Sequence, residues 1–153
     1  MSRIRSKHTK PELILRSLLH RAGFRFKINY NKLPGSPDIV LPKYKTVIFV
    51  HGCFWHRHPN CSKATTPNTN RPYWEKKFDK NVSRDIEIRK ELKRLKWRII
   101  VVWECEVMAD PLAIAKYIIK QLDISNHKIY SIETDRSQII KIAEKRSNYY
   151  LNP

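Results

Sequence analysis

The order of apolar and polar positions along the chain predicts helices and strands in alternation. A first helix is indicated at residues 9–23, where Thr9 and Glu12 have the spacing of a capping box and leucines recur at the helical period until Gly23. Glu12 shares a helix face with these leucines, so we expect its side chain to point toward the interior. A longer helix is predicted for residues 72–96 by an apolar stripe with a period of about 3.6 residues.

Polar residues interrupt the stripe of this long helix. Its apolar members are Trp74, Phe78, Val82, Ile88, Leu92 and Leu95. Asn81 and Asp85 fall on or beside the stripe, four residues apart. Because inward polar groups need partners, both side chains are expected to face a polar site.

Shorter segments have the pattern of strands. Residues 24–28 alternate apolar and basic side chains, as in a half-buried strand, and residues 38–41 predict a second strand. Continuous apolar runs predict buried strands at 46–50 and at 97–105, and a further helix is predicted for 110–122. We therefore expect an α/β protein in which helices flank a mixed central sheet.

The chain is strongly basic, with 31 Lys and Arg residues against 14 Asp and Glu residues and a formal net charge of +17. Its 153 residues predict a single domain, 1–153, in which residues 123–153 form a basic extension of unknown role. This excess of positive charge favours a nucleic acid as partner; a generic solubility charge or a ribosome-associated protein is the alternative. No export signal or membrane span is recognisable, so we expect a cytoplasmic protein.

Cysteine and histidine gather in the segment HGCFWHRHPNC, residues 51–61. Cys53, His58 and Cys61 have the spacing of metal ligands, and Cys105 ends a predicted strand. A reducing cytoplasm disfavours disulfides, whereas three cysteines and one histidine are a frequent ligand set for structural Zn2+. Such a closed site would hold the loop and leave no position for substrate. The alternative is a small core residue at Cys105 and surface histidines.

Three more residues in or near this segment suit catalysis. A fixed, neutral imidazole at His51 or His56 could transfer a proton near neutral pH, although a packed His51 and an exposed His56 would explain the spacing equally well. Asp38 begins a predicted strand, where a carboxylate could bind Mg2+. The alternative for Asp38 is a residue that closes a turn.

Five segments occur in the order RSKHTKPE, LPGSPDIVLP, VIFVHGCFWH, KNVSRD and WRIIVVWEC. Together they resemble the very-short-patch repair (Vsr) DNA mismatch endonucleases, and the resemblance covers about residues 1–106. It implies a restriction-endonuclease-like α/β fold. It also implies nicking of one DNA strand on the 5′ side of the thymine in a T·G mismatch, which repairs deaminated 5-methylcytosine.

The resemblance assigns catalytic roles to particular residues. Asp38 corresponds to the aspartate that binds Mg2+, with the main-chain carbonyl of Val50 as a further metal contact. His56 corresponds to the general base for the attacking water, and Asp85 to the carboxylate that orients it. His51 and Glu12 correspond to further active-site members.

The resemblance also assigns residues to DNA contact and to zinc. Phe54 and Trp55 match an aromatic wedge that enters the duplex beside the mismatched pair, and Met1 falls where a second intercalating residue is found. Lys77 and Asn81 align with residues that contact the mismatch. The zinc ligands carry over as Cys53, His58, Cys61 and Cys105.

The resemblance thus implies a Mg2+-dependent, zinc-stabilised endonuclease for double-stranded DNA. We expect a monomer at the prokaryotic nucleoid that works with general mismatch-repair proteins. One alternative is a nicking or restriction-associated endonuclease without mismatch preference. Another is a zinc-stapled DNA-binding module without catalysis, but binding alone does not require Asp38, His51, His56 and Asp85 together.

Overall fold

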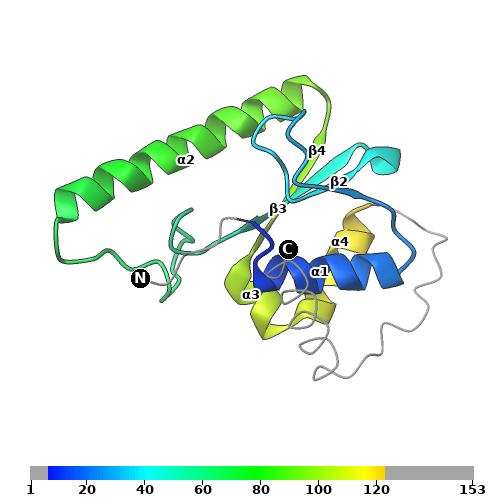
Figure 1. Ribbon diagram of the computed structural model, residues 1–153, viewed down its shortest axis with the longest axis horizontal. Helices are drawn as coiled ribbons and strands as arrows, with labels where there is room; N and C mark the ends of the chain where they lie inside the picture. Colours follow the sequence, from blue (N-terminus) through cyan, green and yellow to red (C-terminus); the bar gives the residue numbers. More distant parts are fainter. Residues whose placement is uncertain (1–6, 123–153) are drawn as a thin grey trace, which may run out of the picture.

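The computed structural model describes residues 7–122, which form a four-stranded sheet with helices on both faces (Figure 1). In chain order the elements are α1 (Lys10–Arg21), β1 (Lys27–Ile28), β2 (Ile39–Leu41), the 3-10 helix η1 (Pro42–Tyr44), β3 (Thr46–His51), α2 (Arg71–Arg94), β4 (Arg98–Trp103), α3 (Glu104–Ala109) and α4 (Pro111–Gln121). Met1 and the segment 123–153 lie outside the described residues, so their predicted roles stay predictions.

The sheet is mixed, as the sequence predicts. Its order is β1-β2-β3-β4, in which β1 and β3 each pair antiparallel with β2 and β3 pairs parallel with β4. A parallel pair needs a crossover, and α2 lies between β3 and β4 in the chain. The carboxyl ends of β3 and β4 therefore meet at one edge, where His51 is in register with Trp103.

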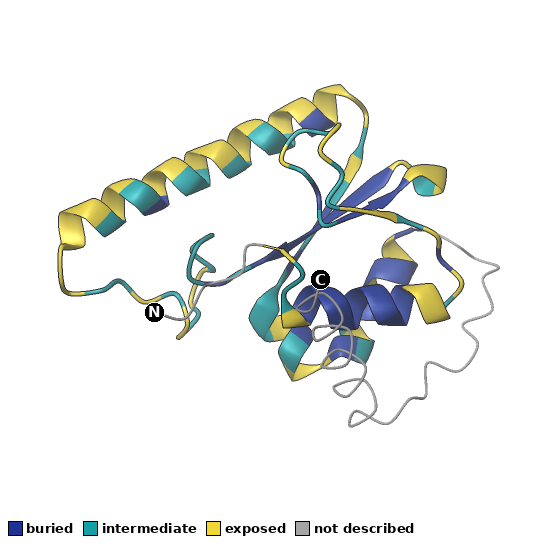
Figure 2. Ribbon diagram, viewed as in Figure 1, coloured by how far each residue is buried: buried dark blue, intermediate teal, exposed yellow. Residues whose placement is uncertain are grey.

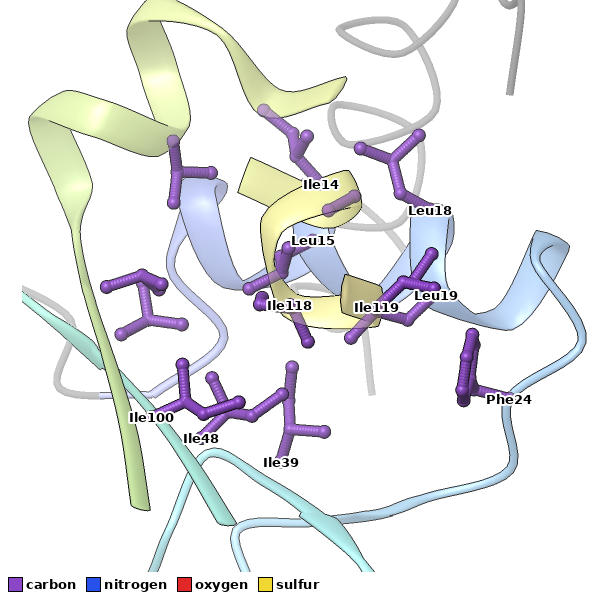
Figure 3. Close-up of a cluster of buried hydrophobic side chains, with 14 of the residues drawn as sticks. Ile14, Leu15, Leu18, Leu19, Phe24, Ile39, Ile48, Ile100, Ile118 and Ile119 are labelled. Carbon is purple, nitrogen blue, oxygen red and sulfur yellow. The ribbon is translucent and has the colours of Figure 1, made fainter. Parts of the chain in front are cut away.

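Strand side chains alternate between two apolar layers. The layer beneath α1 and α4 contains strand residues that pack against the leucines of α1 (Figure 3), among them Ile39, Leu41, Ile48, Val50, Ile100 and Val102. The opposite layer contains Val40, Val47 and Phe49 with Leu92 of α2. Because β3 is buried along its whole length, burial on both faces explains the continuous apolar run at 46–50. The run at 97–105 was also expected to form a buried strand, but β4 lies at the edge of the sheet and only Ile100 and Val102 are buried in it.

Helix α2 is far more exposed than α1 (Figure 2), and only Phe78 and Leu92 are buried among its residues. Leu95, placed on the inward stripe by the sequence pattern, is 40% exposed because the helix ends at Arg94 and Leu95 caps it. Within residues 7–122, none of the helices has the length and apolar character that a membrane crossing requires.

Two further expectations need correction. The strand expected at 24–28 is limited to Lys27–Ile28, and Ile28 is 38% exposed because this short edge strand is not covered by a helix. The strand expected to end at Cys105 ends at Trp103 instead, and Cys105 lies in α3. The turn into α3 is fixed by the Trp103 N–H, which donates to the Glu106 carboxylate at 3.2 Å.

Candidate active site

Asp38 lies at the entrance to β2 and is held from the neighbouring strand. The main-chain N–H of Val50 donates to Asp38 Oδ2 at 2.7 Å. Burial, and then the nearby charge of Glu12, raise the pKa of Asp38 to about 7, although the Val50 hydrogen bond, Arg16 and His56 oppose the change. A carboxylate that is costly to ionise beside a second carboxylate is a favourable ligand for a divalent cation, which neutralises both.

Glu12 is buried as predicted, at 2% exposure, but the expected capping box does not form. The Thr9 hydroxyl donates to Glu12 Oε1 at 3.0 Å, and the His8 N–H donates to Oε2 at 2.9 Å. Arg16, 4% exposed, donates to Glu12 Oε2 at 3.0 Å and to the Asp38 main-chain oxygen at 3.1 Å. Arg16 therefore ties Glu12 to Asp38, a role that the sequence pattern did not predict.

The two candidate catalytic histidines are stacked on each other. Their ring centroids are 3.8 Å apart and their planes differ by 9°. His56 Nδ1 lies 2.6 Å from Asp85 Oδ2. Because an ionised carboxylate only accepts, we assign the proton of this hydrogen bond to Nδ1, which leaves Nε2 of His56 as an acceptor.

The surroundings of these histidines favour a neutral His51 and an ionised Asp85. Burial, followed by the charge of His56, lowers the pKa of His51 to about 3. Burial acts to raise the pKa of Asp85, but the hydrogen bond and charge of His56 outweigh it and hold the pKa below its ordinary value. Among the described residues, Nδ1 of His51 is buried without a hydrogen-bond partner, so the site has an unused polar atom.

The predicted metal ligands converge from two segments of the chain. The ligand atoms of Cys53, His58, Cys61 and Cys105 lie within 4.8 Å of one another and could hold a metal ion. His58 Nδ1 faces the sulfurs, 3.6 Å from Cys53 Sγ and 3.3 Å from Cys105 Sγ. This donor set fits a closed tetrahedral site.

The thiols of this cluster differ in their surroundings. Burial raises the pKa of Cys53 to about 12, whereas main-chain N–H groups, first that of Lys63, lower the pKa of the half-buried Cys61 thiol. A cation bound by the thiolates would offset the cost of ionising Cys53 in the interior.

The segment WEC connects this cluster to the catalytic histidines. The Trp103 ring stacks on His58, with centroids 4.3 Å apart, and meets the His51 ring edge-on at 5.4 Å. Glu104 Oε1 accepts a hydrogen bond from the Cys53 N–H at 3.1 Å. Three consecutive residues, of which Cys105 is the last, therefore hold the loop after β3.

Aromatic side chains form a second cluster between this loop and α2. Phe54 lies 5.6 Å from Trp74 and 5.1 Å from Phe78, and Trp55 lies 5.9 Å from Trp74, as measured between ring centroids. Lys77 Nζ lies 5.3 Å from the Trp55 ring centroid. Trp74, expected in the core, is a half-buried member of this cluster.

Asn81 also contacts this loop, and its side chain donates to the Trp55 main-chain oxygen at 3.3 Å.

One cleft brings the candidate residues together. Its walls include Glu12, Asp38, His51, His56 and Asp85. The cleft is also lined by Phe54, Trp55 and Asn81. Further lining residues were not singled out by the sequence analysis, among them Arg84, Arg89 and Glu104.

A cleft that combines buried carboxylates with an oriented histidine, in a protein of net charge +17, has the chemistry of a DNA endonuclease. The family model described as DNA mismatch endonuclease Vsr matches residues 1–63. The chain is 43% identical over 105 residues to the DNA mismatch endonuclease Vsr of Escherichia coli. The aligned residues make up 69% of this chain and 67% of the relative. The chain belongs to the Vsr family of endonucleases.

Other relatives are type II nicking enzymes. V.NmeAIP of Neisseria meningitidis is 49% identical over 107 residues, which make up 70% of this chain and 76% of the relative. V.XorIIP of Xanthomonas oryzae is 46% identical over 107 residues, or 70% of this chain and 78% of the relative.

Proposed function

We propose that the chain nicks one strand of duplex DNA on the 5′ side of the thymine in a T·G mismatch, by Mg2+-dependent phosphodiester hydrolysis. Its biological role would be very short patch repair of deaminated 5-methylcytosine. The observation that supports this reading best is the 2.6 Å contact between His56 and Asp85 in the same cleft as Asp38. A domain that only binds DNA has no need of this arrangement.

The proposed chemistry assigns one task to each residue. Asp38 and the Val50 carbonyl would hold Mg2+, which supplies charge neutralisation at the phosphate when bound. Asp85 fixes the His56 tautomer so that Nε2 can accept a proton from the attacking water. His51, held neutral by burial, can donate or accept a hydrogen bond beside the scissile phosphate.

Glu12 contributes negative charge next to Asp38 and can orient water bound to the metal. The cluster of Cys53, His58, Cys61 and Cys105 would hold structural Zn2+ in a restriction-endonuclease-like fold. Its three thiols and one imidazole support zinc over harder cations, which prefer oxygen ligands.

Mismatch recognition would use the aromatic cluster. We propose that Phe54 and Trp55 enter the duplex as a wedge, since a mispaired step is less costly to unstack. Lys77 and Asn81 would contact the mismatched pair, and Met1 would be a second intercalating residue. Both Phe54 and Trp55 line the cleft beside the candidate catalytic residues, which supports this assignment.

We also propose a domain organisation, an oligomeric state, a location and partners for the enzyme. Residues 1–153 would form one domain that acts as a monomer on chromosomal DNA in the cytoplasm. General mismatch-repair proteins would be its partners. The segment 123–153, expected to be a basic extension, has five Lys or Arg residues against four Asp or Glu residues, so the positive charge available to the DNA backbone lies in residues 1–122.

The test compares matched and T·G-mismatched duplexes, each incubated with Mg2+ or without added metal. We expect a single nick, only in the mismatched duplex and only with Mg2+. His56→Ala should abolish it, while His20→Ala, an exposed histidine at the end of α1, should not. Equal nicking of both duplexes would favour the second candidate, a nicking enzyme without mismatch preference; relatives named type II nicking enzymes make nicking the activity common to both candidates. Absence of nicking under every condition would contradict the enzyme proposal.

A further inference from the structure

Two arginines of α2 face the cleft on either side of Asp85. Arg84 and Arg89 both line it, together with Asn81, Asp85 and Ile88. These five positions are separated by steps of one, three and four residues, so they share one face of the helix. Apart from Ile88, the face of α2 that lines the cleft is therefore polar and basic along this part of the helix.

Three other basic residues of α2 form ion pairs with carboxylates of the same helix. Carboxylates one turn away form the pairs Arg71–Glu75 at 2.9 Å, Lys90–Glu87 at 3.1 Å and Arg94–Glu91 at 3.9 Å. Arg84 and Arg89 have no hydrogen bond or ion pair of this kind with any residue in 7–122. A bound anion could therefore engage either guanidinium without breaking an existing pair.

The positive charges of Arg84 and Arg89 both interact with candidate catalytic residues. Arg84 interacts electrostatically with Asp85, and Arg89 does so with His51. A guanidinium is weakly hydrated and presents a fork of donors that matches two phosphate oxygens. An anion placed beside these arginines would lie next to the proposed hydrolytic centre.

We propose that Arg84 and Arg89 bind backbone phosphates of the nicked strand, adjacent to the scissile phosphate. The contacts position the strand and carry no base sequence information. This inference rests on the proposed function for the identity of the strand. It assigns to α2 a phosphate-binding face that is distinct from the aromatic cluster.

The test measures DNA binding without cleavage. Arg84→Gln and Arg89→Gln are compared with Lys90→Gln and Arg94→Gln, which remove the same charge from the same helix. The dissociation constants of matched and T·G-mismatched duplexes are measured by fluorescence anisotropy over a range of NaCl concentrations, without added Mg2+.

Each lost phosphate contact should reduce the slope of log K against log salt by about 0.9. At about 0.1 M salt this corresponds to binding that is about eightfold weaker. The loss should be equal for the two duplexes, and the Lys90 and Arg94 variants should keep a slope close to that of the wild type.

An unchanged slope in both arginine variants would overturn the inference, as would an equal reduction in the matched controls. A loss confined to the mismatched duplex would also overturn it, because phosphate contacts do not depend on the base pair. The proposed nicking activity is judged separately, since wild-type protein that binds with the expected arginine dependence but never nicks would contradict the activity alone.

Discussion

Replacing Asp38 by asparagine should stabilise the protein in the absence of Mg2+ while it abolishes nicking. The Asp38 carboxylate is buried near Glu12 and accepts a hydrogen bond from the Val50 N–H at 2.7 Å. An asparagine oxygen can accept the same hydrogen bond, and its amide group removes the negative charge. The variant should therefore keep the fold and lose the proposed metal ligand.

The size of this effect follows from the pKa of Asp38, which burial and then Glu12 raise from 3.8 to about 7. The folded state holds its proton to a higher pH than the unfolded chain, so this group stabilises the fold at low pH and loses that contribution as the pH rises through about 7. One pKa unit corresponds to about 1.4 kcal/mol, so the wild type should be about 4 kcal/mol less stable than the asparagine variant at about pH 8. The difference should fall below about 2 kcal/mol at about pH 5.

Urea unfolding of both proteins at several pH values, without added Mg2+, measures this difference. The exposed Asp79 of α2 provides the matched control, and Asp79→Asn should show no comparable dependence on pH. Addition of Mg2+ at about pH 8 should stabilise the wild type and leave Asp38→Asn unchanged. A stability difference that stays constant with pH would refute the argument from burial, and equal stabilisation of both proteins by Mg2+ would refute the metal assignment.

Three other substitutions test separate parts of the site. Cys105→Ala should reduce bound zinc from about one ion per chain toward zero and lower the melting temperature by about 10 °C or more, as measured by elemental analysis and thermal unfolding. Arg16→Met should cost about 3 to 5 kcal/mol, because the buried Glu12 carboxylate then loses its cationic partner, and the double variant Arg16→Met/Glu12→Gln should recover most of this loss in urea unfolding. Asp85→Asn should slow single-turnover nicking by roughly 100-fold with unchanged DNA affinity, since it alters the orientation of His56 and not the binding surface.

Much of the fold follows from local patterns in the sequence. The apolar runs at 46–50 and within 97–105 are short and uninterrupted, and they form the parallel pair β3 and β4. The ligand spacing around Cys53 correctly predicted a cluster of potential metal ligands. Cys105, which lies in α3, completes this cluster from a distant part of the chain. Asn81 and Asp85 were correctly expected to face a polar site, because a polar group within an apolar stripe needs a partner.

The features that local patterns did not predict depend on contacts between distant segments. Arg16 stands four residues after Glu12 in a leucine-rich helix, which is the spacing of an ordinary surface ion pair, and its burial and its contact with the Asp38 main chain depend on the tertiary fold. Trp74 has the period of a core residue, but α2 extends past the sheet and leaves it half-buried with Phe54. Local sequence thus identifies which residues need partners more readily than it identifies those partners.

The candidate metal ligands and the proposed catalytic histidines alternate within one segment, 51–61, and this has a mechanical consequence. Trp103 contacts both His58 and His51, and Glu104 holds the main chain of Cys53. Because β3 and β4 are parallel, their carboxyl ends meet, and the segment after β4 can anchor the segment after β3 at three consecutive positions. A closed metal site at this cluster, without contact to the substrate, would then influence the proposed reaction, since catalytic groups displaced by about 1 Å lose much of their effect. Separate loops for the two sets of residues would remove this coupling, which gives a physical reason for both to occupy the segment 51–61.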